Sequence, residues 1–217
     1  MFEVTQVGSW PRSEGLLASL ADLQAGNITR EEFDRVADGE VKRSVELQIE
    51  AGVDIVVDGE QRRDSFVSFV TEKVDGTKLM SLEETADGQK GFDEMLEAAD
   101  VKRGTIRNPV CVDKLARRDP LALDEFKFVK TLTDKPVKIP LPGPYLLIRS
   151  MWSPKFSKKF YPEPTDMADD IVSILRDELI ELRDAGCEFV QFDEPVLTEV
   201  VHSGSDQEGE SFSRTFM

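Results

Sequence analysis

Short apolar runs and longer amphipathic stretches alternate along this chain. Runs rich in β-branched and aromatic residues predict five strands, at residues 2–7, 53–57, 108–112, 136–142 and 188–192. Helical spacing and end signals predict helices between them, at residues 13–23, 29–50, 121–132 and 166–185. Strands that alternate with helices indicate an α/β fold with a parallel sheet.

Capping and turn residues mark several expected boundaries. Thr29 and Glu32 have the spacing of a capping box at the start of the long helix. The chain is expected to be helical again from Arg63, and the Asp-Gly pair at residues 75–76 is typical of a hairpin turn. Residues 83–103 are polar and charged. We therefore expect one domain over residues 1–217, in which residues 74–107 form a hairpin and a lid-like insertion.

Two of the predicted strands end in acidic residues. Asp58 and Glu60 follow the second strand, and Asp193 and Glu194 follow the last one. Ligands of parallel α/β folds bind at the carboxyl ends of the strands. Acidic side chains are costly to bury there unless they bind something. The sequence therefore predicts one site built from several strand ends.

Composition and charge narrow the class of protein. The chain has 217 residues, of which 40% are hydrophobic, and a formal net charge of -16. This charge disfavours binding to nucleic acid or to anionic membranes. No apolar run approaches the roughly 18 residues of a membrane span, and the first residues lack the features of a signal peptide. Cys111 and Cys187 form no disulfide framework. We expect a cytoplasmic protein.

Polar residues at several strand ends favour a barrel. No glycine-rich phosphate motif follows any predicted strand, so a nucleotide-binding fold has no direct support. A closed barrel needs eight strands and typically about 250 residues. We therefore expect a TIM-type (β/α)8 barrel, of which this chain holds the first five βα units.

Four short motifs follow predicted strands in a fixed order. They are Gly-Ser-Trp-Pro at residues 8–11, Asp-Gly-Glu-Gln-Arg-Arg at 58–63, Gly-Pro at 143–144 and Phe-Asp-Glu-Pro at 192–195. Together they resemble the cobalamin-independent methionine synthase family, specifically its catalytic C-terminal barrel and shorter stand-alone relatives. The resemblance implies a (β/α)8 barrel in which zinc binds the thiol of homocysteine and a methyl group moves to it from a methyl-folate. Zinc turns a bound thiol into the nucleophilic thiolate near neutral pH.

The resemblance also implies roles for single residues. Gly8 and Ser9 match the loop that holds the backbone of homocysteine. Glu60 and Asp193 match two acids that contact its amino group, and two carboxylates facing an ammonium form strong charged hydrogen bonds. Glu194, which is adjacent to Asp193, is a further candidate for substrate binding.

Two residues are candidates for the methyl-donor side. Trp152 lies near the position of a tryptophan that stacks on the folate ring, and Arg107 is a second candidate for contact with folate. Purely structural roles remain open for Trp152 and for Glu60. Trp152 lies in an aromatic-rich stretch that is also typical of packing, and Glu60 has Arg62 and Arg63 nearby as ion-pair partners.

The sequence departs from the family at the zinc site. The family's ligands are a His-x-Cys pair, a glutamate and a further cysteine, all after the Asp-Glu-Pro motif. His202 is the only histidine and has no cysteine two positions later, and the two cysteines are far apart. We therefore assign no catalytic residue and no metal ligand to this chain. We expect the zinc ligands beyond residue 217, and we expect the chain by itself to be inactive.

We expect an enzyme similar to 5-methyltetrahydropteroyltriglutamate–homocysteine S-methyltransferase, with two alternatives. The first is another thiol alkyltransferase of the same superfamily, since some relatives take coenzyme M or other thiols. Binding of homocysteine, and not of a sulfonate thiol, through Glu60 and Asp193 discriminates between the two. The second alternative is a non-catalytic half-barrel that self-associates or binds a partner chain, because open sheet edges pair readily and uncovered core faces are apolar.

Overall fold

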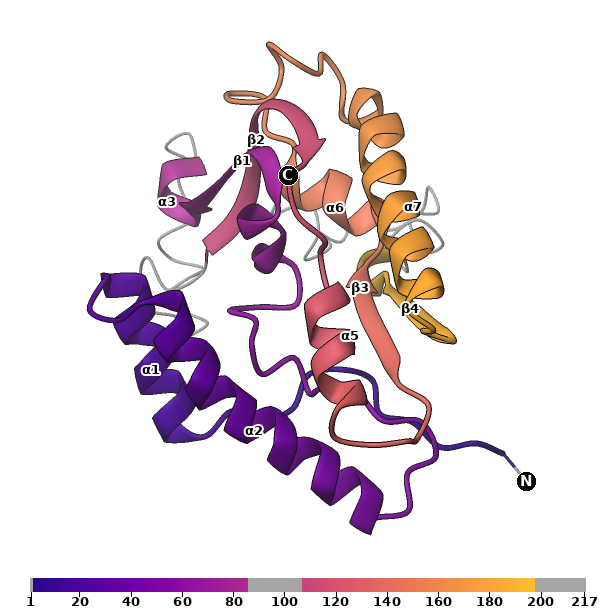
Figure 1. The fold of residues 1–217 in the computed structure, drawn as a ribbon. Coiled ribbons are helices and arrows are strands. Elements are labelled where there is room, and N and C mark those ends of the chain that lie inside the picture. The colour runs from indigo at the N-terminus through magenta and orange to yellow at the C-terminus, as the bar shows by residue number, and fades with distance from the viewer. Residues whose placement is uncertain (1, 86–106, 198–217) are drawn as a thin grey trace, which may run out of the picture.

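The computed structural model describes residues 2–85 and 107–197 (Figure 1). Its helices are α1 (Glu14–Ala25), α2 (Arg30–Glu50), α3 (Leu82–Thr85), α5 (Leu123–Lys130), α6 (Pro144–Met151) and α7 (Ala168–Asp184). Its strands are β1 (Val74–Ser81), β2 (Arg107–Arg117), β3 (Lys138–Pro142) and β4 (Phe189–Asp193). Three short 3-10 helices are η1 (Ser68–Glu72), η2 (Pro164–Met167) and η3 (Pro195–Leu197). The fold is α/β, as the alternating pattern predicted.

Four extended segments run parallel and carry the site. β3 pairs with β4 along its length, from Lys138 opposite Phe189 to Pro142 opposite Asp193. The segment at residues 53–57 joins β3 through a parallel bridge between Val56 and Val137. A further parallel bridge joins Thr5 to Ile55. Since all four segments point the same way, the residues that follow them meet at one edge.

β1 and β2 form a separate antiparallel ribbon. Val74 lies opposite Arg117, and Ser81 lies opposite Arg107. The predicted strand at residues 108–112 therefore belongs to this ribbon and not to the parallel set, so the described residues hold four parallel segments where five were expected. Its apolar pattern was read correctly as a strand, but the pattern says nothing about the partner with which a strand pairs.

The Asp-Gly pair at residues 75–76 is not a hairpin turn. It lies inside β1, where the register shifts between Asp75 and Thr77 and Gly76 has a φ of 82°. A Cβ on Gly76 would lie 2.3 Å from the carbonyl oxygen of Lys114. Glycine is needed here because residues 112–115 of β2 lie opposite this single position and bring the carbonyl of Lys114 close to it. Residues 86–106, which hold most of the expected lid-like insertion, lie outside the described residues.

Local signals predicted the first two helices well. The side chain of Ser13 accepts a hydrogen bond from the backbone of Leu16 at 3.2 Å, and Gly26 ends α1 in the left-handed conformation. The expected capping box at Thr29 opens α2. The helix expected from Arg63 is only the 3-10 turn η1. Helix α6, which was not predicted, is a short helix whose N-terminus depends on a side chain distant in sequence.

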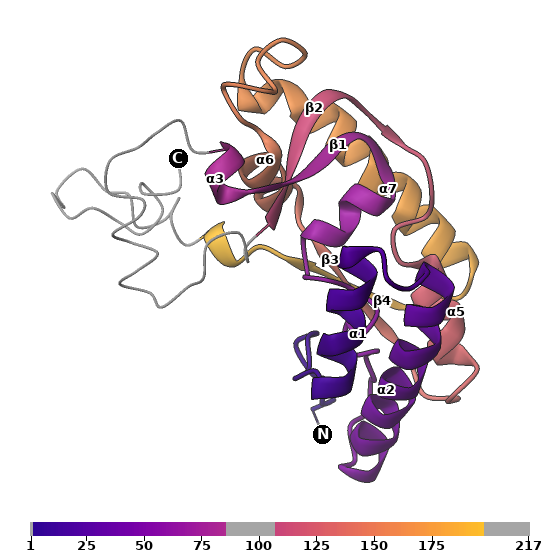
Figure 2. The same cartoon turned by 90° about the vertical axis from the view of Figure 1, so that its left-hand side faces the viewer.

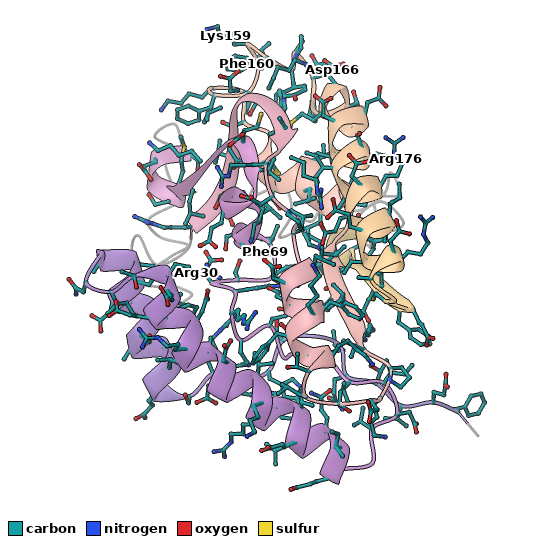
Figure 3. The ribbon with its side chains drawn as sticks, in the orientation of Figure 1. Arg30, Phe69, Lys159, Phe160, Asp166 and Arg176 are labelled. Atoms are coloured by element: carbon teal, nitrogen blue, oxygen red, sulfur yellow. The ribbon has the colours of Figure 1, made fainter. Side chains whose placement is uncertain are left out.

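The helices form two groups around one main core. α6 and α7 lie beside the β1–β2 ribbon, and α1 and α2 lie together at the other end of the molecule (Figure 2). The main core includes Val56, Ile139, Leu141 and Tyr161. A small second cluster packs α1 on α2. At the N-terminus of α2, Arg30 (Figure 3) pairs with Glu72 of η1. No helix of the described residues is long and apolar enough to cross a membrane.

Candidate functional site

A cleft of about 500 Å³ opens where the parallel segments end. It is lined by Val7, Gly8, Ser9, Glu60, Phe66, Gln191, Phe192, Asp193, Glu194 and Pro195. All five residues predicted to bind substrate are in this set. A second cavity, of about 10 Å³, is lined only by apolar core side chains and is too small for a substrate. The cleft is therefore the candidate site.

Glu60 reaches the cleft because the chain turns sharply after Val57. Gly59 and Glu60 both have positive φ values, 74° and 54°. Glu60 is the only non-glycine residue of the described chain with a positive φ, a conformation that costs free energy and is held by its surroundings. The backbone N–H of Glu60 donates to Oδ1 of Asp58 at 2.9 Å, which stabilises the turn. The turn brings the Glu60 carboxylate to the ends of the neighbouring segments.

The Glu60 carboxylate contacts the loop after the first segment. Its Oε2 atom accepts a short hydrogen bond from the hydroxyl of Ser9. A Cβ on Gly8 would lie 2.8 Å from Oε1, so the glycine permits the close approach of the loop. Only 1% of Glu60 is exposed to solvent. Gly8 and Ser9 thus do more than form a turn, because they hold a buried carboxylate.

Asp193 lies on the same cleft at the end of β4. Its Oδ1 atom accepts a hydrogen bond from Nε2 of Gln191 at 2.6 Å. Oε1 of Gln191 in turn accepts from Nζ of Lys138 at 2.7 Å. Burial lowers the pKa of Lys138, and the negative charge of Asp193 opposes this effect. Asp193 is half-buried, so its carboxylate is accessible from the cleft.

Glu194 uses both carboxylate oxygens to cap α6. Oε1 accepts from the backbone N–H of Tyr145 at 2.8 Å, and Oε2 accepts from that of Leu146 at 2.9 Å. N–H groups in the first turn of a helix have no partner within the helix, and Glu194 supplies one for each of these two. The helix dipole also favours a negative charge at this position. A Cβ on Gly143 would lie 2.1 Å from Oε1, so the cap requires glycine at that position. The structure thus gives Glu194 a structural function that the sequence did not suggest.

The two candidates for the methyl-donor side, Trp152 and Arg107, are not among the residues that line the cleft. Trp152 ends α6, packs against the main core, and donates from Nε1 to the carbonyl of Tyr161 at 2.9 Å. Arg107 is exposed at the start of β2, opposite Ser81. Trp152 therefore packs on the main core, and the roles of Trp152 and Arg107 toward a methyl donor remain predictions.

Arg63 is the site residue whose importance sequence reasoning missed. Its guanidinium is buried and donates to both oxygens of Glu125, at 3.1 and 2.6 Å, and to the carbonyl of Pro140 at 3.0 Å. Burial alone would lower the pKa of Arg63, but the charge and hydrogen bonds of Glu125 outweigh it and raise the pKa. The pair of arginines at residues 62–63 was the only signal. Arg62 itself pairs with Asp38 and not with Glu60.

Two buried carboxyl groups beside Arg63 are difficult to ionise. Burial raises the pKa of Asp58, although Arg63 and the N–H of Glu60 oppose the effect. Burial likewise raises the pKa of Glu125, against the charge of Arg63. The Oδ2 atom of Asp58 has no hydrogen-bond partner among the described residues. On this side of the cleft, three carboxyl groups surround the guanidinium of Arg63, and burial favours the protonated form of two of them.

The described residues do not fit a zinc site. No group of three or more His, Cys, Asp or Glu side chains among residues 2–85 and 107–197 could hold a metal ion. Cys111 is buried and Cys187 half-buried, and burial raises the pKa of both thiols. His202 lies outside the described residues. The chemistry that can be assigned to this part of the chain is recognition of a cationic group by carboxylates.

Comparisons with known proteins agree on one family. Residues 2–215 match the profile described as the catalytic domain of cobalamin-independent synthase. The chain is 30% identical to the 5-methyltetrahydropteroyltriglutamate–homocysteine methyltransferase of Thermotoga maritima over 199 residues. The aligned region covers 92% of this chain and 25% of that protein. The chain is also 30% identical to the methionine synthase of Saccharolobus solfataricus, over 91% of this chain and 54% of that protein.

Two solved structures extend the comparison to the fold. A B12-independent methionine synthase from Shewanella sp. W3-18-1, in complex with selenomethionine, superposes with a TM-score of 0.60 at 27% identity and covers 82% of this chain. A putative vitamin-B12 independent methionine synthase from Listeria monocytogenes gives a TM-score of 0.65 over 97% of this chain, and at 21% identity it shows the fold alone. This chain spans 48% and 57% of those two proteins.

Proposed function

The chain belongs to the family of cobalamin-independent methionine synthase catalytic domains, and we propose that the complete protein moves a methyl group from a methyl-folate donor to the thiol of homocysteine. The names of its relatives support this reaction. The described part of the chain supplies the site for the amino-acid end of homocysteine.

We further propose that the four parallel segments are part of a TIM-type (β/α)8 barrel. Their shared direction and the likeness to the two solved structures support this assignment. In such a barrel the active site lies at the carboxyl ends of the strands. The cleft occupies this position, because its acidic residues follow residues 53–57 and β4.

The placement of Glu60 and Asp193 on one cleft is the observation that carries the proposal. Their carboxylates come from different strand ends and hold the ammonium group of homocysteine between them by charge-assisted hydrogen bonds. Ser9 positions Glu60 by donating to its Oε2 atom. We call these three residues, Ser9, Glu60 and Asp193, the amino-acid clamp. The related Shewanella protein binds selenomethionine, which has the same α-amino group.

The clamp binds and orients the acceptor but supplies no nucleophile. The thiol of homocysteine is the attacking group, and its orientation depends on how firmly the other end of the molecule is held. Zinc, when bound in this family, would supply the thiolate. The described residues contain no group of side chains suited to hold zinc.

A binding experiment tests the clamp without requiring turnover. The chain is titrated calorimetrically with L-homocysteine, with 4-mercaptobutanoate, which lacks the amino group, and with coenzyme M. We expect homocysteine to bind at least about tenfold more tightly than 4-mercaptobutanoate, because it adds charged hydrogen bonds. Equal or tighter binding of coenzyme M would favour another thiol alkyltransferase. Equal binding of homocysteine and 4-mercaptobutanoate would rule out the clamp.

A second proposal concerns the edges of the parallel set. Val7 and Phe192, which also line the cleft, are 78% and 41% exposed near the ends of the first segment and of β4. Exposed apolar side chains on strands whose edges are open favour association. We propose that this chain self-associates or binds a partner chain through these edges. A single monomeric species in light scattering, unchanged over a hundredfold concentration range, would contradict self-association through these edges.

A further inference from the structure

The guanidinium of Arg63 joins three elements beneath the cleft. Arg63 ends the turn at residues 58–63, and its side chain reaches Glu125 in the first turn of α5 and the carbonyl of Pro140 in β3. The guanidinium carbon also lies 4.2 Å from the ring centre of Phe69 in η1, a residue labelled near the middle of the molecule in Figure 3. Arg63 is therefore held from several sides.

The distances separate the partners of Arg63 into two kinds. Nη2 is 2.6 Å from Oε2 of Glu125, which is a direct hydrogen bond. Nη1 is 3.7 Å from Oε1 of Glu60, which is beyond hydrogen-bond distance, while the same Nη1 donates to Pro140. Arg63 therefore attracts the Glu60 carboxylate without occupying its lone pairs. Those lone pairs are left for Ser9 and for a ligand.

Charge in this buried region favours a cationic ligand. Asp58, Glu60 and Glu125 all lie around the single guanidinium of Arg63. Arg12 approaches the same turn, but it donates to the backbone carbonyls of Glu60 and Arg63. A ligand ammonium beside Glu60 would favour the ionised forms of Asp58 and Glu125, which burial opposes. A thiol without an amino group gains nothing from this arrangement.

We propose that Arg63, locked by Glu125, is a positioning residue that sets the preference of the cleft for thiols bearing an ammonium group. This inference rests on the proposed amino-acid clamp and extends it to two residues that do not line the cleft. If Glu125 loses its charge, Arg63 loses its main partner and turns to Glu60 as a direct hydrogen-bond partner. Glu60 would then be less available to the ligand.

The test measures the ratio of affinities for L-homocysteine and 4-mercaptobutanoate in the full chain. We expect Glu125→Gln to lower this ratio by about tenfold, the size of one charged hydrogen bond, because Arg63 then engages Glu60 directly. Arg63→Met removes the cation that holds the Glu60 carboxylate in place, and it should lower the ratio by a similar factor because Glu60 is then no longer oriented toward the ligand. Arg63→Lys keeps the charge but lacks the planar group that reaches Glu125 and Pro140 together, and should restore the ratio only in part. The affinity for 4-mercaptobutanoate itself should change little.

Arg62→Met is the matched control. Arg62 also pairs with a carboxylate, that of Asp38, and its guanidinium also lies 4.2 Å from an aromatic ring centre, that of Phe128. The Arg62→Met variant should leave the ratio of the two affinities unchanged. If circular dichroism shows that Arg63→Met does not fold, the same ratio can be measured for Glu125→Gln and Arg63→Lys.

Two results would overturn the inference in distinguishable ways. Equal weakening of both thiols in the Arg63 and Glu125 variants would show that the pair acts only on the stability of the cleft. A wild-type chain that does not prefer homocysteine would instead remove the proposed clamp, and this inference with it. A lower ratio in the variants, with Arg62→Met unchanged, supports the positioning role.

Discussion

The two acidic strand ends look alike in sequence and differ in the structure. Asp58 and Glu60 lie in a fully buried turn, where the Glu60 carboxylate is held by Ser9 and approached by Arg63. At the end of β4, Asp193 is half-buried on the cleft, while the adjacent Glu194 caps α6. At the first strand end, fixed partners hold the carboxylate of Glu60 in place. At the second, Asp193 is accessible to a ligand and Glu194 caps a helix.

This difference shows why adjacent acids need separate arguments. A buried carboxylate with fixed partners loses little conformational entropy when a ligand binds. Its effect on affinity therefore comes mainly from its charge. A carboxylate that satisfies two backbone donors of a helix is part of the fold, and removing it costs stability first. Four predictions test the comparison between the two ends.

The largest effect is expected at the buried end. Glu60→Gln keeps the shape of the side chain but removes the charge that faces the ligand ammonium. We expect homocysteine binding to weaken by about 2–5 kcal/mol, as for other buried charge pairs. Isothermal titration calorimetry measures the change, with 4-mercaptobutanoate as the control ligand. Equal losses for both ligands would show that Glu60 does not contact the amino group.

Asp193→Ala should have the next largest effect on binding. The charged hydrogen bond to the ammonium is lost, and we expect homocysteine to bind more weakly by about 1–3 kcal/mol. Because Asp193 is half-buried, water replaces part of the lost contact. The folding stability should change little, and a chemical denaturation curve serves as the control. Unchanged affinity would exclude Asp193 from the clamp.

Glu194→Ala should mainly affect stability. Loss of the cap leaves the N–H groups of Tyr145 and Leu146 without their partner, and we expect a loss of about 1–2 kcal/mol of unfolding free energy. Glu194→Gln keeps one acceptor oxygen and should lose about half as much. Urea denaturation measures both variants. A stable Glu194→Ala protein with weakened homocysteine binding would instead assign Glu194 to the ligand.

The smallest effect concerns the dependence of stability on pH. Burial raises the pKa of Asp58, while Arg63, Arg62 and the N–H of Glu60 lower it in part. The folded state therefore binds more protons than the unfolded chain between the ordinary pKa of about 4 and the raised value. The stability from this group is fully present below pH 4 and is lost as the pH rises through the raised pKa.

Asp58→Asn removes this titration and keeps an oxygen for the N–H of Glu60. The variant should lose less stability than the wild type as the pH rises from 4 to 7, in thermal denaturation. Glu125 titrates in the same direction and remains in both proteins, so part of the slope should persist. An identical slope in both proteins would mean that Asp58 is ionised throughout this range.

Much of the secondary structure was predictable because its signals are local. The cap at Ser13, the capping box at Thr29 and the amphipathic pattern of α7 depend on residues a few positions apart. The structure differs where the deciding contact is distant in sequence. Gly76 has the left-handed conformation that its sequence suggests, but it lies inside β1, where the carbonyl of Lys114 on the partner strand leaves no room for a Cβ. α6 has a local start signal in Pro144, but the cap of its N-terminus comes from Glu194, which is 49 positions from Tyr145 in sequence.

The sequence by itself determined which acidic residues follow which apolar segments, and hence that Gly8, Ser9, Glu60, Asp193 and Glu194 share one end of the fold. That inference needs only the common direction of parallel segments. Tertiary structure alone decided that Glu60 is held by Ser9 and Arg63, that Arg63 is locked by Glu125, and that Glu194 belongs to α6. These assignments depend on which side chains pack within a few ångströms of each other across elements, and charge pairing and burial are set by that packing rather than by position along the chain.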